Sequence, residues 1–167
     1  MRKSVLSVIF FFFLLPSLYS QSRWIDLRSL PVINSDDRYE DVYFMNGSTG
    51  WIIHGLGKVY KTTDGGRTFP LIYSSPSFNF FRSIGFFDEN TGIAGTLTAP
   101  GTLQRTTNGG LNWNSVTSNI TGTVPLGVCG IDIVNSETAI AVGRYSCPPY
   151  FLRTTNKGAD WVSRTLD

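Results

Sequence analysis

The apolar positions of this chain fall into short runs that alternate with polar residues and recur along the sequence. Each repeat opens with such a run, and these runs are 41–44, 83–86 and 130–133. A polar turn follows, and then a second run of small and apolar residues at 50–53, 92–95 and 139–142. Short alternating runs bounded by turn residues are typical of β-strands. The pattern predicts an all-β fold of repeated short strands, because no segment has convincing helical periodicity.

One motif occurs once in each repeat: Thr-x-Asp/Asn-x-Gly-x-x-aromatic. The residues that fit it are Thr62, Asp64, Gly66 and Phe69; Thr106, Asn108, Gly110 and Trp113; and Thr154, Asn156, Gly158 and Trp161. The Asp or Asn positions are 44 and 48 residues apart. A period of this length suits a unit of four short strands.

The chemistry of the motif is that of a tight hairpin turn. Asp and Asn side chains accept hydrogen bonds from backbone N–H groups in such turns, and a nearby threonine can bond locally to the turn. Glycine tolerates the positive φ that these turns need. The aromatic residue can pack over the hairpin or between neighbouring sheets. We therefore predict a structural role for every motif residue and assign no catalytic residue.

Residues 1–20 have the layout of a signal peptide. Arg2 and Lys3 precede an apolar run at 5–15, and the breaker Pro16 and the small residue Ser20 follow it. The run is shorter than the roughly 20 residues that a membrane-spanning helix needs. We expect export to the periplasm, the cell surface or the medium. The alternative is an uncleaved N-terminal anchor, which would be the chain's membrane contact.

Removal of the signal peptide abolishes the net charge. The whole chain has 14 Lys+Arg and 12 Asp+Glu, and Arg2 and Lys3 leave with the signal, so the mature chain has 12 of each. No basic stripe remains, and we expect no nucleic-acid partner. Cys129 and Cys147 lie in the third repeat, where an oxidising compartment makes a disulfide plausible; two free thiols are the alternative. The single His54 lacks partners at metal-ligand spacing, so we expect no metal and no cofactor.

The motif and its surroundings resemble the Asp-box, or bacterial neuraminidase repeat, superfamily. The order of Trp24, Pro31, Asp41, Trp51 and the first motif is most similar to the photosystem II stability/assembly factor-like propellers. The resemblance covers nearly all of the mature chain. It implies β-propeller blades of four antiparallel strands in a ring of about six to eight blades.

The resemblance sets the expected domain limits. Residues 21–167 would form a partial propeller, with blades at about 39–75, 81–118 and 127–167. Trp24 precedes Val42 by the same 18 residues that separate Trp113 from Ile131, which places an outer strand near 22–30. In closed propellers such a strand completes the last blade. Three blades leave the ring incomplete, so we expect the N-terminal part of a longer protein; self-assembly of a short chain is the alternative.

Function is less constrained, because sialidases, glycosidases, receptors and assembly factors all carry such repeats. We favour an exported non-catalytic scaffold that binds a protein partner or assists assembly at the cell envelope. The second hypothesis is a carbohydrate-active enzyme that acts on a glycan, with its catalytic residues in missing blades. The third is an adhesion or ligand-binding module of a larger surface protein.

Two regions are candidates for contact with a partner. Asp36, Asp37, Glu40 and Asp41 form the densest acidic cluster, which fits a solvated loop or a ligand contact. Insertions at 98–102 and 144–150 interrupt the second and third repeats at the same place. Insertions at one place in successive blades decorate one face, often the binding face.

Overall fold

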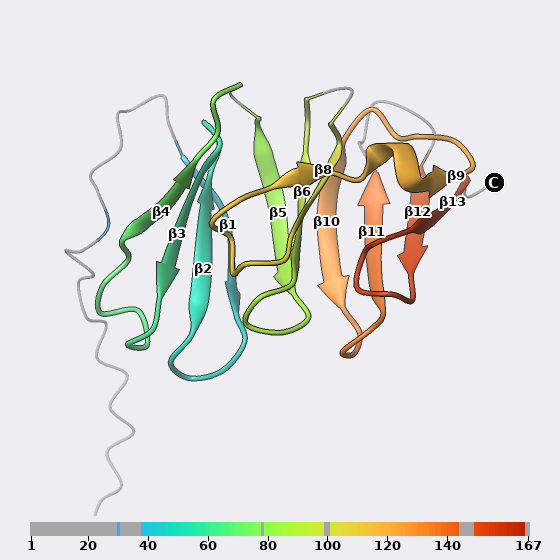
Figure 1. Ribbon diagram of the computed structural model, residues 1–167. Helices are drawn as coiled ribbons and strands as arrows, with labels where there is room; N and C mark the ends of the chain where they lie inside the picture. The colour runs from blue at the N-terminus through green and yellow to red at the C-terminus, as the bar shows by residue number, and fades with distance from the viewer. Residues whose placement is uncertain (1–29, 31–37, 78, 99–100, 144–148, 166–167) are drawn as a thin grey trace, which may run out of the picture.

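The computed structural model describes residues 30, 38–77, 79–98, 101–143 and 149–165, and these are almost entirely β-structure (Figure 1). The signal segment, Trp24 with its expected outer strand, and Cys147 lie outside these ranges, so those expectations stay predictions. Within the described ranges, no helix has the length and apolarity needed to cross a membrane.

The strands form three sheets, which we call blades 1, 2 and 3. Blade 1 contains β1 (Tyr39–Phe44), β2 (Gly50–His54), β3 (Lys58–Thr62) and β4 (Leu71–Ser74). Blade 2 contains β5 (Phe81–Phe86), β6 (Gly92–Thr96), β7 (Leu103–Thr106) and β8 (Asn114–Ser115). Blade 3 contains β10 (Val128–Ile133), β11 (Ala139–Gly143), β12 (Tyr150–Thr154) and β13 (Trp161–Thr165). In each blade these four strands pair antiparallel in chain order, which confirms the expected fold class.

Blade 3 also carries a fifth strand that the sequence did not predict. After β8 the chain forms a 3₁₀ turn, η1 (Thr117–Asn119), and then β9 (Ile120–Thr121). β9 pairs parallel with β13, through Trp161 opposite Ile120 and Val162 opposite Thr121. The connection from blade 2 thus runs along the outer edge of blade 3 before it enters β10. Two residues are too few for an alternating pattern to reveal a strand.

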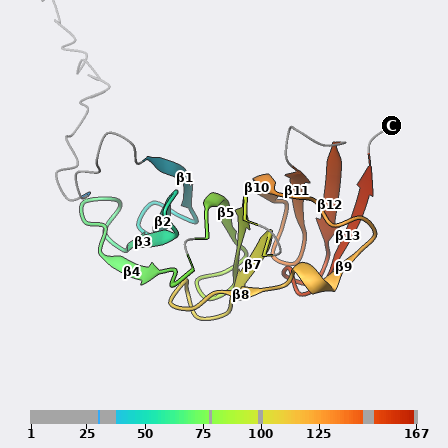
Figure 2. The same ribbon diagram turned by 90° about the horizontal axis from the view of Figure 1, so that it is seen from above.

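The blades stand side by side in an arc, with their first strands together and their fourth strands outward (Figure 2). β5 lies between β1 and β10. The pairing of each first strand with its neighbour shifts register at the same place: between Tyr39 and Asp41, Phe81 and Ser83, and Val128 and Gly130. A bulge of this kind bends and twists a strand. Its recurrence gives the three blades the same shape, so that they can stack in the same way.

The hydrophobic core lies between blades rather than within them. Between blades 1 and 2, the buried Trp51 ring stacks on Phe86 with centroids 3.7 Å apart and planes 9° from parallel. Its indole N–H donates to the backbone oxygen of Gly109, at 3.0 Å. Ile93 occupies the position of Trp51 in blade 2 and is fully buried in the core shared with blade 3. Each interface is therefore filled by the second residue of a blade's second strand.

The motif glycines test this packing. Gly66 and Gly158 both have positive φ, 88° and 73°, so alanine at either site would be strained by the backbone alone. A Cβ on Gly158 would lie 2.1 Å from Ile93 Cδ1, whereas a Cβ on Gly66 would come no closer than 3.4 Å to Phe69. Gly158→Ala should lower the free energy of unfolding by about 1–3 kcal/mol more than Gly66→Ala, because only the former overpacks an interface. Urea unfolding of both variants would measure the difference, and equal losses would contradict this packing.

Candidate functional site

The motif residues build the same hydrogen-bonded turn in all three blades. In blade 1, the Thr62 hydroxyl donates to Asp64 Oδ1 at 2.8 Å and accepts from the Gly66 N–H at 2.9 Å. Asp64 Oδ1 also accepts from the N–H of Thr68, at 2.9 Å. The same three bonds recur around Asn108 in blade 2 and Asn156 in blade 3, at 2.9–3.1 Å. The threonines and glycines are thus engaged in the turn itself.

A second turn lies beside each motif turn and is bonded to it. It joins the first two strands of the blade, and its Asn or Asp accepts two backbone N–H bonds; these residues are Asn46, Asp88 and Asn135. Backbone bonds of 2.8–2.9 Å then connect the two turns: Gly65 to Ser48, Gly109 to Asn90, and Lys157 to Glu137. One end of every blade is therefore a pair of mutually bonded turns.

Lys157 is the one departure from glycine at its motif position, and it ties blade 3 to blade 2. Its φ of 53° lies in the left-handed region, where Gly65 and Gly109 stand in the other blades. Its ammonium is 3.0 Å from Asp88 Oδ2 and 3.7 Å from Glu137 Oε1. Its carbonyl oxygen accepts from Arg105 Nε at 2.8 Å. These contacts between blades compensate for the backbone strain of a non-glycine residue.

The acids at the turn end are poor candidates for general acids. The N–H and hydroxyl of Thr68, with the hydroxyl of Thr62, lower the pKa of Asp64 to about 2. Burial opposes ionisation of Asp88, but the N–H groups of Thr91 and Asn90 and the Lys157 ammonium outweigh it and lower the pKa of Asp88 to about 2. A glycosidase needs one carboxyl that stays protonated until it donates its proton. Asp64 and Asp88 are ionised at neutral pH and bound to their turns.

The acidic cluster at the start of blade 1 is structural where it is described. Glu40 is not solvated as expected: its side chain is only 1% exposed, and it pairs with Arg38 and with Arg82 of blade 2. Asp41 accepts from the N–H groups of Val42 at 2.8 Å and Ile84 at 2.9 Å. The sequence could not reveal these bonds, because Arg82 and Ile84 lie one repeat further along the chain. Asp36 and Asp37 lie outside the described residues.

The remaining sequence candidates show no assembled chemistry. His54 is buried, and its Nδ1 accepts from the N–H of Leu56 at 3.1 Å. Cys129 is half-buried on β10, and its bridge to Cys147 stays a prediction. Within the described part of the chain, no group of three His, Cys, Asp or Glu side chains could hold a metal ion.

An apolar groove lies at the opposite end of the blades from the motif turns. We call it the loop-end groove; its volume is about 580 Å³, and its lining residues are Thr102, Ser115, Thr117, Ser118, Val124, Pro125 and Leu126. Val124 is 43% and Leu126 54% exposed. Sequence reasoning missed both, because an apolar residue in a turn-rich segment gives no periodic signal.

The groove lies between the described bases of the two insertions. Thr102 ends the first insertion and lines the groove. Pro125 approaches Gly143, which directly precedes the second insertion: a Cβ there would lie 3.5 Å from Pro125 Cβ. The expected partner face and the exposed apolar residues therefore coincide at one end of the blades. Residues 99–100 and 144–148 are outside the described ranges.

Comparisons with known proteins place this architecture. No family model matches the sequence, and no curated protein sequence matches it. Two YCF48 structures are similar in fold: YCF48 bound to a D1 peptide, at 23% identity and TM-score 0.57, covering 75% of this chain and 38% of that one, and YCF48 from Cyanidioschyzon merolae, at 21% and 0.57, covering 81% and 40%. The GH74 enzyme of Niastella koreensis is similar at 17% identity and TM-score 0.52, covering 77% and 22%.

These similarities establish the class of fold. The chain consists of β-propeller blades, three of them in a ring that is not closed. It spans between 22% and 40% of the length of the three structures. At these identities the likeness concerns the fold alone, and both a peptide-bound protein and an enzyme share it.

The buried motif threonine should be the most sensitive position of the turn. Thr106 is 1% exposed and its hydroxyl bonds both Asn108 Oδ1 and the Gly110 N–H. Thr106→Val should lower the free energy of unfolding by about 1–3 kcal/mol, because a buried N–H loses its acceptor. Thr106→Ser keeps the hydroxyl and is the matched control. A smaller loss for valine than for serine in urea unfolding would refute the role of the hydroxyl.

Asp64 should give blade 1 an acid-sensitive turn. Its pKa falls from 3.8 to about 2 on folding, so its stabilising effect is full above pH 4 and disappears as the pH falls through about 2. Asp64→Asn cannot titrate, and it should flatten the loss of unfolding free energy between pH 4 and 2. Asn108→Asp introduces a carboxylate in the equivalent turn and should steepen it. Urea titrations across this pH range would compare the slopes, and unchanged slopes would contradict the assignment.

Proposed function

We propose that this chain is part of an exported, non-catalytic β-propeller scaffold that binds a protein partner, or assists assembly at the cell envelope, through the loop-end groove. The observation that carries the proposal is the position of Val124 and Leu126, both exposed, in a groove between the two insertions. Exposed apolar side chains that gather in a groove mark interaction sites. Export rests on the signal-peptide pattern of residues 1–20.

The rest of the molecule supports a scaffold rather than a catalyst. The turn-end residues bond to one another, Glu40 is paired, and Asp41 bonds the neighbouring blade. A rigid frame that presents loops on one face is a common arrangement for binding. YCF48, one of the similar structures, is bound to a peptide, which shows that this kind of propeller takes protein partners. We infer that this chain belongs to the Asp-box propellers and forms the N-terminal part of a longer ring.

The alternative is a carbohydrate-active enzyme, and the similarity to the GH74 enzyme favours it. On this alternative the catalytic carboxylates would lie in further blades, because the acids at the turn end are held by their own turns. The two hypotheses differ in what the full chain does to a glycan. An enzyme releases reducing ends from polysaccharides or sialosides, and a binding scaffold leaves them intact.

A photo-reactive residue placed at Leu126 should cross-link the partner in the cells that produce the protein. Leu111 is the matched control, because it is 55% exposed against 54% for Leu126 but lies in the motif turn at the other end of blade 2. We expect one protein, identified by mass spectrometry, to be cross-linked at position 126 and not at 111. Leu126→Asp should abolish its co-purification, and Leu111→Asp should not.

Three results would count against the scaffold proposal. They are no cross-linked protein at position 126, the same proteins at both positions, or release of reducing sugar by the purified full chain.

A further inference from the structure

Two faces of the described structure lack the neighbouring blade that covers the corresponding faces inside it. We call the outward face of blade 1 the leading face; its residues are Tyr39, Val42, Phe44, Ile52, Gly66 and Phe69. We call the outward face of blade 3 the trailing face; its residues are Ile140, Val142, Phe151, Arg153 and Val162. The repeat allows each face to be compared, position by position, with the covered faces of the other blades.

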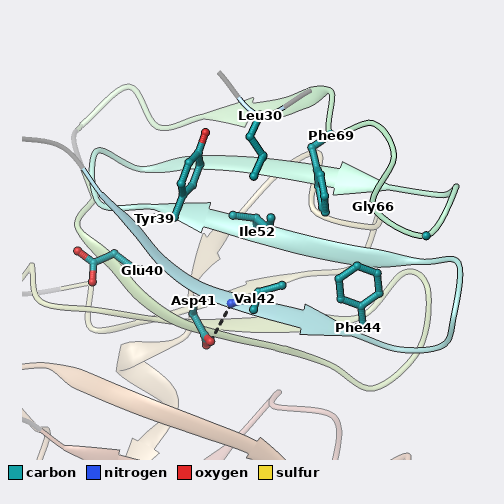
Figure 3. A pocket seen from close by; sticks show the side chains of 10 residues that line it. Leu30, Tyr39, Glu40, Asp41, Val42, Phe44, Ile52, Gly66 and Phe69 are labelled. Carbon is teal, nitrogen blue, oxygen red and sulfur yellow. Dashed lines mark hydrogen bonds between the residues drawn. The ribbon is translucent and has the colours of Figure 1, made fainter. Parts of the chain in front are cut away.

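The leading face is an open apolar hollow of about 520 Å³ (Figure 3). Val42 is 56% and Phe44 43% exposed. Their counterparts in blade 2, Ile84 and Phe86, are 2% and 1% exposed because blade 1 covers them. Tyr39, Ile52 and Phe69 line the same hollow, with Leu30 against it. This face therefore has the composition of a covered blade face without a blade on it.

The two covered interfaces show what such a face receives. On blade 2 it receives Trp51, which stacks on Phe86, and Lys61, whose ammonium lies 4.9 Å from the centroid of the Trp51 ring. On blade 3 it receives Ile93 against Gly158, and Arg105, which donates to the carbonyl of Lys157. In both cases an apolar residue of the second strand and its cationic partner in the third strand meet the next motif turn.

The trailing face carries the same pair. Ile140 of β11 is paired with Arg153 of β12, as Trp51 is with Lys61 and Ile93 with Arg105. Val142 and Val162 beside them are 45% and 49% exposed. The trailing face of blade 3 thus offers what the leading face of blade 1 lacks.

We propose that the trailing face of one copy of this chain packs on the leading face of a second copy, and that two copies close a ring. Ile140 then takes the place of Trp51 and contacts Phe44, and Arg153 reaches the carbonyl of Gly65. Contacts between unlike faces form a ring where the rotation closes. Two copies supply six blades, within the four to eight that propellers contain, whereas three copies would supply nine. The second copy is favoured because this interface already occurs twice within the chain.

Sedimentation velocity of the full chain over a range of concentrations should show a species of two copies. Ile140→Asp on the trailing face and Val42→Asp on the leading face should each shift it to a single copy. Leu111→Asp, equally exposed but on neither face, should leave it unchanged. Circular dichroism and the melting temperature verify that each variant is folded.

Two mixing experiments test which faces meet. A mixture of the Ile140→Asp and Val42→Asp chains retains one intact pair of unlike faces, so it should recover association that neither variant has alone. Chains with Ile140→Cys should form a disulfide with chains carrying Phe44→Cys under mild oxidation, and neither should form it alone. A wild-type chain that stays single at all concentrations, a pair that survives Ile140→Asp, or a mixture without recovery or cross-link would overturn the proposal.

Discussion

The structure depends on one hydrogen-bonded hydroxyl in each blade. Thr62, Thr106 and Thr154 are between 0% and 2% exposed, and each hydroxyl joins the Asp or Asn of its turn to the N–H of the motif glycine. A buried N–H without an acceptor would be strongly unfavourable, so the turn has one low-energy arrangement. That arrangement sets the register of the third and fourth strands. It also positions a backbone carbonyl at which the neighbouring blade can bind.

The fold was largely predictable because it is repeated. Three occurrences of Thr-x-Asp/Asn-x-Gly compensate for the weak signal of each short strand, and the alternation at Val42, Ile84 and Ile131 marks where each blade starts. The fifth strand of blade 3 was not predictable. Ile120 and Thr121 belong to no repeat, and only the three-dimensional path of the connection brings them beside Trp161.

The candidate binding surface was predictable only in outline. The shared location of the two insertions indicated which end of the blades to consider. Val124 and Leu126 had no comparable signal, because their exposure depends on how the segment before β10 crosses between two blades. Long-range partners were also invisible: the sequence places Glu40 among other acids, and the fold brings Arg82 to it from the next blade. Repetition therefore predicts the frame, and the departures from repetition determine the surface.

The parallel strand β9 has a consequence for the order in which the protein comes apart. Because β9 leaves blade 2 and lies on the edge of blade 3, detaching the last strand of blade 2 also removes a hydrogen-bonded neighbour from Trp161 and Val162. Asn119 adds a bond of 2.9 Å to the carbonyl of Ala159. In the described connection from blade 1 to blade 2, no strand pairs with either edge. Blades 2 and 3 are thus joined as one cooperative unit, while blade 1 can open separately, as local unfolding in repeat proteins allows.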